Sequence, residues 1–136
     1  MTEGPPPIRD VDGTELLDAS AVLAWLQRER GADQVDAIIE RSSIGAANWS
    51  EVLRKAWQHG QDGDEVAALL VALGLKVETV TPEIAIEAAR MWSQCPDLSL
   101  ADRLCLGAGK IRGATVWTAD RTWVGRSHGV VVRLLR

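Results

Sequence analysis

The chain has 136 residues, of which 46% are hydrophobic and 25% are charged, and its formal net charge is −4. This length fits a single domain with a sizeable core, and the apolar content excludes a disordered or collagen-like chain. The longest apolar runs fall short of the roughly 20 residues that a membrane span needs, so we expect a cytoplasmic protein with neither a membrane span nor a secretory signal.

The charge is distributed unevenly along the chain. Residues 1–68 hold 13 acidic and 6 basic side chains, a net charge of −7, whereas residues 69–136 hold 6 acidic and 9 basic side chains, a net charge of +3. A basic surface beside a few acids is compatible with a phosphodiester substrate, and also with an ordinary solvated surface.

The first half of the chain begins with a segment that has no periodic pattern. Residues 1–13 include three consecutive prolines, and we interpret them as a flexible leader to a domain at residues 14–136. The elements predicted next are a buried strand at Leu16–Leu17 ending at Asp18, helices at 21–29 and from Asp33, a strand at Ser43–Ala47, and helices from Trp49 and over Asp64–Leu73.

The second half continues the alternation of strands and helices. Its predicted elements are a strand at Lys76–Val80, a helix starting at Thr81-Pro82-Glu83, a helix from Ser99, and strands at Ala114–Thr118 and Gly129–Leu134. Two helices are expected to bury the stripes Trp49, Val52, Leu53, Ala56, Trp57 and Ala85, Ala88, Ala89, Trp92. The alternation predicts an α/β fold with a mostly parallel sheet of four to five strands, covered by helices on both faces.

Four acidic residues stand where such a sheet places its ligands, at the carboxyl ends of its strands. Asp18 and Asp120 close strands, Glu51 follows the second strand, and Asp102 lies one turn into the helix from Ser99. If the strand ends converge, four carboxylates meet at one edge of the sheet. Such a cluster suits Mg²⁺ or Mn²⁺, ions that coordinate phosphate oxygens and activate water for phosphodiester hydrolysis.

Each acid also has a purely structural explanation. Asn48-x-x-Glu51 and Ser99-x-x-Asp102 both have the form of a capping box, and Asp18 and Asp120 are each placed to cap a helix. A fifth acid, Asp97, precedes the late helix, and we interpret it as a loop or cap residue rather than a ligand. The residues alone leave both interpretations open.

Three segments together resemble a known family. The segments LLDASAVLAWL, NWSEVL and LSLADRLCLGAGKIRGATVWTADRTW are similar to those of the PIN domain, specifically of a VapC-type toxin from a toxin–antitoxin pair. The resemblance spans about Glu15 to Arg136. Each motif is weak alone, but their order and total span make the set specific.

The resemblance implies a metal-dependent endoribonuclease with strand order 3-2-1-4-5. It implies that Mg²⁺ or Mn²⁺ is held by Asp18, Glu51, Asp102 and Asp120, with Ser20 and Thr118 orienting the carboxylates. Arg103 and Arg121, next to two of the acids, are candidates for holding RNA phosphates. The expected partners are RNA, a second copy in a homodimer, and a VapB-like antitoxin that covers the site.

Two other functions remain possible from the sequence. One is a non-catalytic protein-binding module that keeps the fold. The other is a phosphoacceptor domain similar to response-regulator receivers, which have an acidic pair after the first strand and a lysine closing a late strand. Here the first strand offers only Asp18, and the final strand offers Arg133.

Overall fold

The computed structural model describes residues 15–135, and the predicted leader at residues 1–13 lies outside the described residues. Its strands are β1 (Glu15–Leu17), β2 (Ser42–Gly45), β3 (Lys76–Glu78), β4 (Thr115–Thr118) and β5 (Val132–Leu134). They form one sheet in the order β3-β2-β1-β4-β5, in which every neighbouring pair is parallel. The predicted sheet and its strand order are confirmed.

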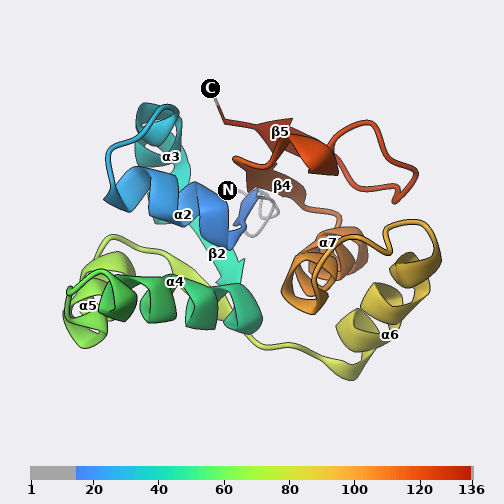
Figure 1. Cartoon of the computed structure of the whole chain (residues 1–136), viewed down its shortest axis with the longest axis horizontal. Coiled ribbons are helices and arrows are strands. Elements are labelled where there is room, and N and C mark those ends of the chain that lie inside the picture. The colour runs from blue at the N-terminus through green and yellow to red at the C-terminus, as the bar shows by residue number, and fades with distance from the viewer. Residues whose placement is uncertain (1–14, 136) are drawn as a thin grey trace, which may run out of the picture.

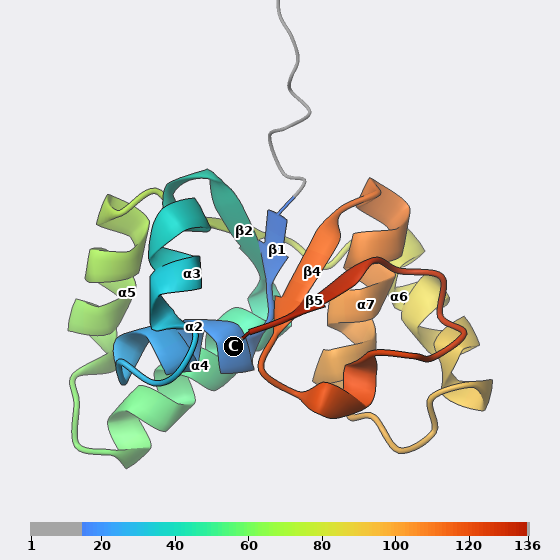
Figure 2. The same cartoon turned by 90° about the horizontal axis from the view of Figure 1, so that it is seen from above.

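Helices cover both faces of this sheet. The α-helices are α2 (Ala19–Leu26), α3 (Ala32–Ile38), α4 (Ala46–Gln58), α5 (Gly63–Ala72), α6 (Pro82–Arg90) and α7 (Leu100–Arg112). Short 3₁₀ turns are η1 (Ile39–Arg41), η2 (Met91–Ser93) and η3 (Arg121–Trp123). In Figures 1 and 2, α2 to α5 lie on one side of the sheet and α6 and α7 on the other, which makes three layers. Within residues 15–135, none of these helices has the length and hydropathy to cross a membrane.

The central strand β1 divides the hydrophobic core in two. Leu17 packs with residues of α2, α3, α4 and α5, whereas Leu16 packs with residues of α6 and α7, and neither leucine is exposed. Side chains alternate between the two faces of a strand, so two neighbouring leucines anchor both layers. This burial fixes the end of β1, and with it the position of Asp18.

Helix starts in the second half follow the sequence signals. Thr81 caps α6 by accepting a hydrogen bond from the Ile84 N–H, and Pro82 is the first helical residue. Ser99 caps α7 and forms a reciprocal capping box with Asp102. Both predicted helix starts are confirmed, and the second fixes the backbone at one of the four acids.

The start of α4 differs from the prediction. The helix begins at Ala46 with Gly45 as its N-cap, so Asn48 is already helical and the predicted capping box with Glu51 is wrong. Asn48 is instead buried, and its amide donates 3.5 Å hydrogen bonds to Glu51 and to the Ala101 carbonyl of α7. A buried amide needs partners, and here its partners join α4 to α7.

Two predicted stripes are partly wrong. On α4, Val52 and Ala56 are buried, but Trp57 is 52% exposed. On α6, Ile84 and Ala88 are buried, while the predicted Ala85 and Ala89 are exposed.

Close contact with α7 determines which face of α6 is buried. A Cβ on Gly107 of α7 would lie 3.0 Å from the Ile84 carbonyl oxygen, so the two helix backbones approach closely at this point. That contact sets the buried face of α6, which a run of alanines leaves nearly undetermined because each alanine offers little apolar area. Trp92, the last residue of the predicted stripe, follows α6 in η2 and is 60% exposed.

Candidate functional site

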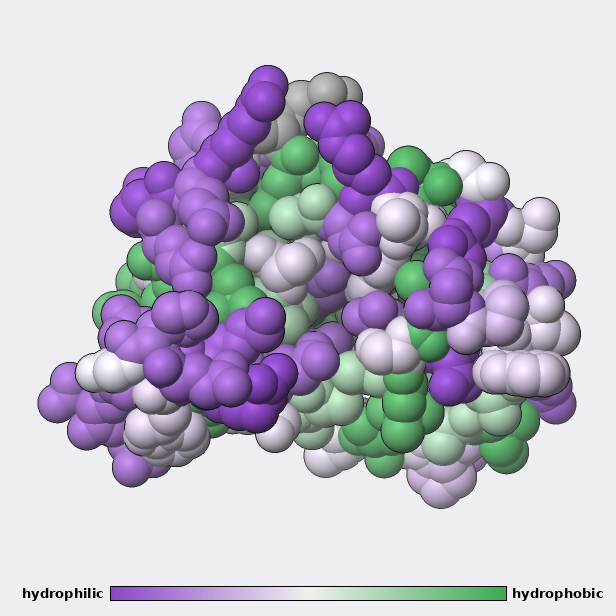
Figure 3. Space-filling view, viewed as in Figure 1, coloured by the Kyte–Doolittle hydropathy of each residue, from purple (hydrophilic) through white to green (hydrophobic). Residues whose placement is uncertain are grey.

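All four predicted acids line one cavity at the carboxyl ends of the strands. This cavity, called the acidic cavity below, has a volume of about 160 Å³ and is lined by Asp18, Ala19, Ser20, Leu23, Glu51, Lys55, Asp102, Asp120 and Trp123. Figure 3 shows this face in space-filling form, with hydrophilic side chains around a recessed centre between α2, α4 and α7. The structure therefore brings together acidic residues that are up to 102 positions apart in the sequence.

Asp18 is the most buried of the four, with 3% of its surface exposed. Its carboxylate accepts a 2.8 Å hydrogen bond from the Ala21 N–H, which caps α2. It also accepts hydrogen bonds from the hydroxyls of Ser20, at 2.8 and 2.9 Å, and Thr118, at 2.6 Å. The two predicted orienting residues thus contact the carboxylate directly, and the capping interpretation of Asp18 holds at the same time.

The other three acids come from α4, α7 and the segment after β4. Asp102 accepts a hydrogen bond from the Ser99 N–H in the capping box of α7. Asp120 caps η3 by accepting hydrogen bonds from the N–H and hydroxyl of Thr122. Glu51 accepts from the Asn48 amide. Three of the four acids therefore cap a helix and line the cavity, so the two interpretations left open by the sequence are compatible.

The carboxylates affect one another electrostatically. Burial raises the pKa of Asp18 to about 6, hydrogen bonds from Thr118, Ala21 and Ser20 oppose this rise, and the charge of Asp102 adds to it. Burial likewise raises the pKa of Asp102, and the charge of Asp120 contributes. The clustered negative charge is thus only partly compensated by protein donors.

The negative charge of the carboxylates also acts on the thiol of Cys105. Cys105, one turn after Asp102 on α7, is buried, and burial raises its pKa well above the usual value. The charges of Asp18, Asp102 and Glu51 raise that pKa further. Cys105 is accordingly a protonated, apolar part of the core rather than a metal ligand or a nucleophile.

The donor set fits a hard divalent cation. Four carboxylates supply only oxygen ligands, which Mg²⁺ and Mn²⁺ prefer, and a dication relieves their mutual repulsion. Within residues 15–135, no group of three or more His, Cys, Asp or Glu side chains is already arranged to hold an ion. The carboxylates of Asp18, Asp102 and Asp120 are held by hydroxyls and helix N–H groups.

Of the cavity residues that were not predicted from the sequence, Lys55 and Trp123 carry polar groups. Lys55 lies one helical turn after Glu51 on α4, and it is the basic residue among those that line the acidic cavity. Trp123 is buried at the cavity, and its indole N–H has no hydrogen-bond partner in the described part of the chain. The i, i+4 spacing from Glu51 was the available signal for Lys55.

The predicted phosphate-binding arginines lie outside the acidic cavity. Arg103 donates hydrogen bonds to the carbonyls of Leu98 and Ala88, so its side chain ties α7 to α6. Arg121 lines a neighbouring cavity. Asp97, which the sequence placed in a loop or cap, forms a bidentate ion pair with Arg126 and does not line the acidic cavity.

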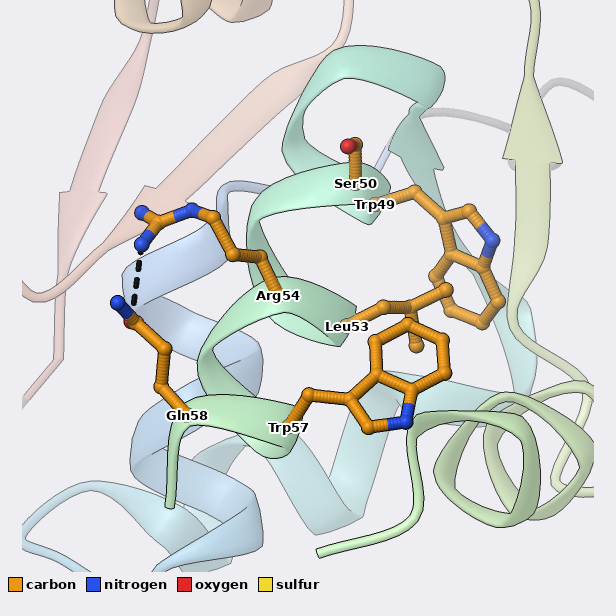
Figure 4. Close-up of a pocket in the computed structure, with 6 residues that line it drawn as sticks. All are labelled: Trp49, Ser50, Leu53, Arg54, Trp57 and Gln58. Carbon is orange, nitrogen blue, oxygen red and sulfur yellow. Dashed lines mark hydrogen bonds between the residues drawn. The ribbon is translucent and has the colours of Figure 1, made fainter. Parts of the chain in front are cut away.

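A larger cavity of about 610 Å³ lies on α4 and contains no acidic residue. Figure 4 shows Trp49, Leu53 and Trp57 on one side of the helix, with Arg54 hydrogen-bonded to Gln58 on the other. We call Trp49, Leu53 and Trp57 the apolar face of α4. Unlike the acidic cavity, this face has no side chain that ionises or coordinates a metal ion.

Comparison with known families and structures gives one family and a consistent set of folds. The PIN domain family model matches residues 16–125. No curated protein matches the chain.

Among solved structures, the chain is similar to a toxin–antitoxin complex from Klebsiella pneumoniae, with a TM-score of 0.72 and 18% identity over 88% of this chain and 95% of the other. It is also similar to FitAcB from Neisseria gonorrhoeae, with a TM-score of 0.69 and 19% identity over 87% of this chain and 95% of the other. A third similar structure is a VapC toxin from Mycobacterium tuberculosis that is described as cleaving the sarcin–ricin loop. Its TM-score is 0.65, with 17% identity over 85% of this chain and 98% of the other. At these identities the similarity establishes the fold.

Proposed function

This chain belongs to the PIN domain family, and from that premise we propose that it is a metal-dependent endoribonuclease, the toxin of a VapBC-like toxin–antitoxin pair. The observation that carries the proposal is the convergence of Asp18, Glu51, Asp102 and Asp120 on one cavity at the carboxyl ends of the strands. Nuclease activity is typical of PIN domains, and the similar structures include the toxin–antitoxin complex from Klebsiella pneumoniae and DNA-bound VapBC from Salmonella typhimurium.

In this proposal the four carboxylates hold Mg²⁺ or Mn²⁺, with Asp18 and Asp102 as the primary ligands and Glu51 and Asp120 completing the set directly or through water. The ion, when bound, stabilises charge on a phosphate oxygen and lowers the pKa of water for hydrolysis of an RNA phosphodiester, leaving a 5′-phosphate on one product.

The protein's own groups prepare this site. Ser20 and Thr118 hold the Asp18 carboxylate in place through their hydroxyls, which restricts the rotamers open to a ligand. Lys55 supplies a positive charge at the rim of the acidic cavity. A phosphate approaching four carboxylates is repelled by them, and an ammonium group at the rim offsets part of that repulsion. We assign Lys55 to substrate binding for this reason.

The proposed macromolecular partner is a VapB-like antitoxin. One of the similar structures is a toxin–antitoxin complex, which supports a partner of this kind. The apolar face of α4 offers Trp57, which is 52% exposed, and the partly buried Trp49 and Leu53 for such a contact. A homodimer is the proposed oligomeric state of the toxin, and light scattering of the purified chain measures it directly.

The test is cleavage of mixed cellular RNA by the purified, antitoxin-free protein. We expect discrete fragments in Mg²⁺ or Mn²⁺ and none in EDTA. A folded protein that binds Mn²⁺ in calorimetry but cleaves no RNA with either metal contradicts the nuclease proposal and supports the non-catalytic module. Labelling by acetyl phosphate instead supports the phosphoacceptor alternative.

A further inference from the structure

A second cavity, with two arginines in its lining, lies beside the acidic cavity. It has a volume of about 230 Å³, and we call it the arginine cavity; its lining residues are Ala24, Glu29, Arg30, Ala119, Arg121, Leu134 and Leu135. Arg30 follows α2, Arg121 begins η3, and the leucines belong to β5 and the residue after it. Three segments that are distant in sequence therefore build one surface.

The two cavities share their walls. Helix α2 contributes Ala19, Ser20 and Leu23 to the acidic cavity and Ala24 to the arginine cavity. The segment after β4 contributes Asp120 to the first and its neighbours Ala119 and Arg121 to the second. This segment is fixed, because the Ala119 N–H donates a 2.9 Å hydrogen bond to Ser20. Asp120 and its two chain neighbours therefore separate the cavities by a single residue, so one RNA strand bound at Asp120 can contact both cavities.

The arginines of this cavity are not engaged elsewhere in the described part of the chain. Arg28, Arg90 and Arg126 form ion pairs with carboxylates, and Arg103 binds two carbonyls. Neither Arg30 nor Arg121 forms an ion pair or a side-chain hydrogen bond within residues 15–135, and both are exposed. Two exposed guanidinium groups outweigh the single carboxylate of Glu29, which leaves the cavity with a net positive charge.

The rest of the lining is apolar. Ala24, Leu134 and Leu135 offer a surface against which a flat base can pack, while a guanidinium binds phosphate oxygens through two N–H groups at once. A base reaches such a surface only when it is free of a duplex. The combination of cation and apolar wall therefore suits one nucleotide of a single strand better than an isolated anion.

We propose that the arginine cavity binds the nucleotide adjacent to the cleaved phosphodiester in single-stranded RNA, with Arg30 and Arg121 on its phosphate. The proposal rests on the proposed nuclease function, which it extends by giving the substrate a second point of attachment. The two arginines are binding residues, and they take no part in the chemistry at the carboxylates.

The experiment measures RNA binding without cleavage. Asp102→Asn serves as the parent, and R30Q/R121Q and R41Q are added to it separately. Arg41 is a suitable control because it is exposed and its guanidinium donates a hydrogen bond to the Ala37 carbonyl. It also precedes β2, at the amino ends of the parallel strands, whereas the arginine cavity lies at their carboxyl ends. Fluorescence anisotropy with a labelled mixed-sequence RNA of 12 nucleotides gives Kd over a series of salt concentrations, and circular dichroism checks the fold.

We expect R30Q/R121Q to raise Kd at least about tenfold, as for lost hydrogen bonds to charged groups, and R41Q to leave it near the parent value. The slope of log K against log salt should fall by about 0.7, the value for one phosphate contact on a single strand. The same change in the wild-type background should raise KM for cleavage.

Two results overturn the inference. If R30Q/R121Q binds RNA like R41Q while the wild type cleaves RNA, the arginine cavity is not a nucleotide site and the nuclease proposal survives. The inference also fails if the variant loses binding only to an acidic peptide and keeps RNA affinity, because the cavity then serves a protein partner. A wild type that neither binds nor cleaves RNA refutes the proposed function itself, and the inference with it.

Discussion

The hydroxyl of Thr118 at the end of β4 donates a 2.6 Å hydrogen bond to Asp18 at the end of β1. The same oxygen accepts a 3.0 Å hydrogen bond from the backbone N–H of Asp120. One fully buried hydroxyl therefore couples two of the four acids of the cavity. It also lowers the pKa of Asp18 against the larger effect of burial.

Removing this hydroxyl should weaken metal binding without disturbing the core. Thr118→Val keeps the shape of the side chain but leaves Asp18 without its shortest hydrogen bond. We expect a loss of about 10–100-fold in Mn²⁺ affinity or in cleavage, as for other residues that orient metal ligands. Calorimetry and initial cleavage rates measure the two effects. Thr118→Ser retains the hydroxyl and should stay near the wild type; equal activity of the Val variant would refute the positioning role.

The carboxylate of Asp102 should be essential for cleavage. Asp102→Asn should abolish cleavage, because an amide is a poor ligand for a divalent cation and carries no charge. The fold should survive, since the amide oxygen can still accept the hydrogen bond from the Ser99 N–H that closes the capping box. Gel assays of RNA cleavage and a thermal melt are the measurements.

Asp97 provides the matched control for this prediction. It lies five residues before Asp102, but its carboxylate pairs with Arg126 outside the acidic cavity. Asp97→Asn should cleave RNA at the wild-type rate, with at most a small loss of stability from an exposed ion pair. Loss of cleavage in this variant equal to that of Asp102→Asn would mean that the site has been placed at the wrong acids.

The stability of the metal-free protein should fall as the pH rises from 5 to 7.5. The pKa of Asp18 is about 6 in the folded protein against an ordinary value of 3.8, so the folded state binds this proton more tightly. Its contribution to stability is complete below the unfolded pKa and is lost as the pH rises through the folded pKa. For these two values the loss between pH 5 and 7.5 is on the order of 1 kcal/mol.

Urea unfolding in EDTA at both pH values tests this dependence. Asp18→Asn removes the titrating group and keeps an acceptor for the Ala21 N–H, so the difference between variant and wild type isolates Asp18 from other titrating groups. Mg²⁺ should stabilise the wild type at pH 7.5 and stabilise Asp18→Asn less, because the ion binds the folded state. A wild type and a variant with identical pH dependence would exclude Asp18 as its cause.

The sequence predicted the sheet because its strands are short, apolar and bounded by clear helix starts. Leu16 and Leu17 are consecutive apolar residues, a pattern that places β1 in the middle of a sheet covered on both faces. Once the strand ends are known, Asp18 and Asp120 follow from topology alone. The convergence of the four acids was predictable for the same reason.

What the sequence did not predict depends on how helices rotate against the sheet. The earlier start of α4 places Asn48 inside the helix, where its amide contacts Glu51. Periodicity likewise grouped Trp57 with Val52 although only Val52 is buried. An apolar stripe wider than the contact it makes does not reveal which side faces the core. The rotation of α4 also decides that Lys55 reaches the acidic cavity.

Lys55 is expected to bind an RNA phosphate at the acidic cavity. Lys55→Ala should raise KM for RNA several-fold and leave Mn²⁺ affinity near the wild-type value, because the ammonium group binds the substrate rather than the metal. Lys55→Arg keeps the charge and should recover most of the affinity. Arg54→Ala is the matched control: it removes one positive charge from the adjacent position, but Arg54 pairs with Gln58 and lies outside the acidic cavity. Equal increases in KM for Lys55→Ala and Arg54→Ala would attribute the effect to net charge, and would refute a specific contact between Lys55 and the RNA phosphate.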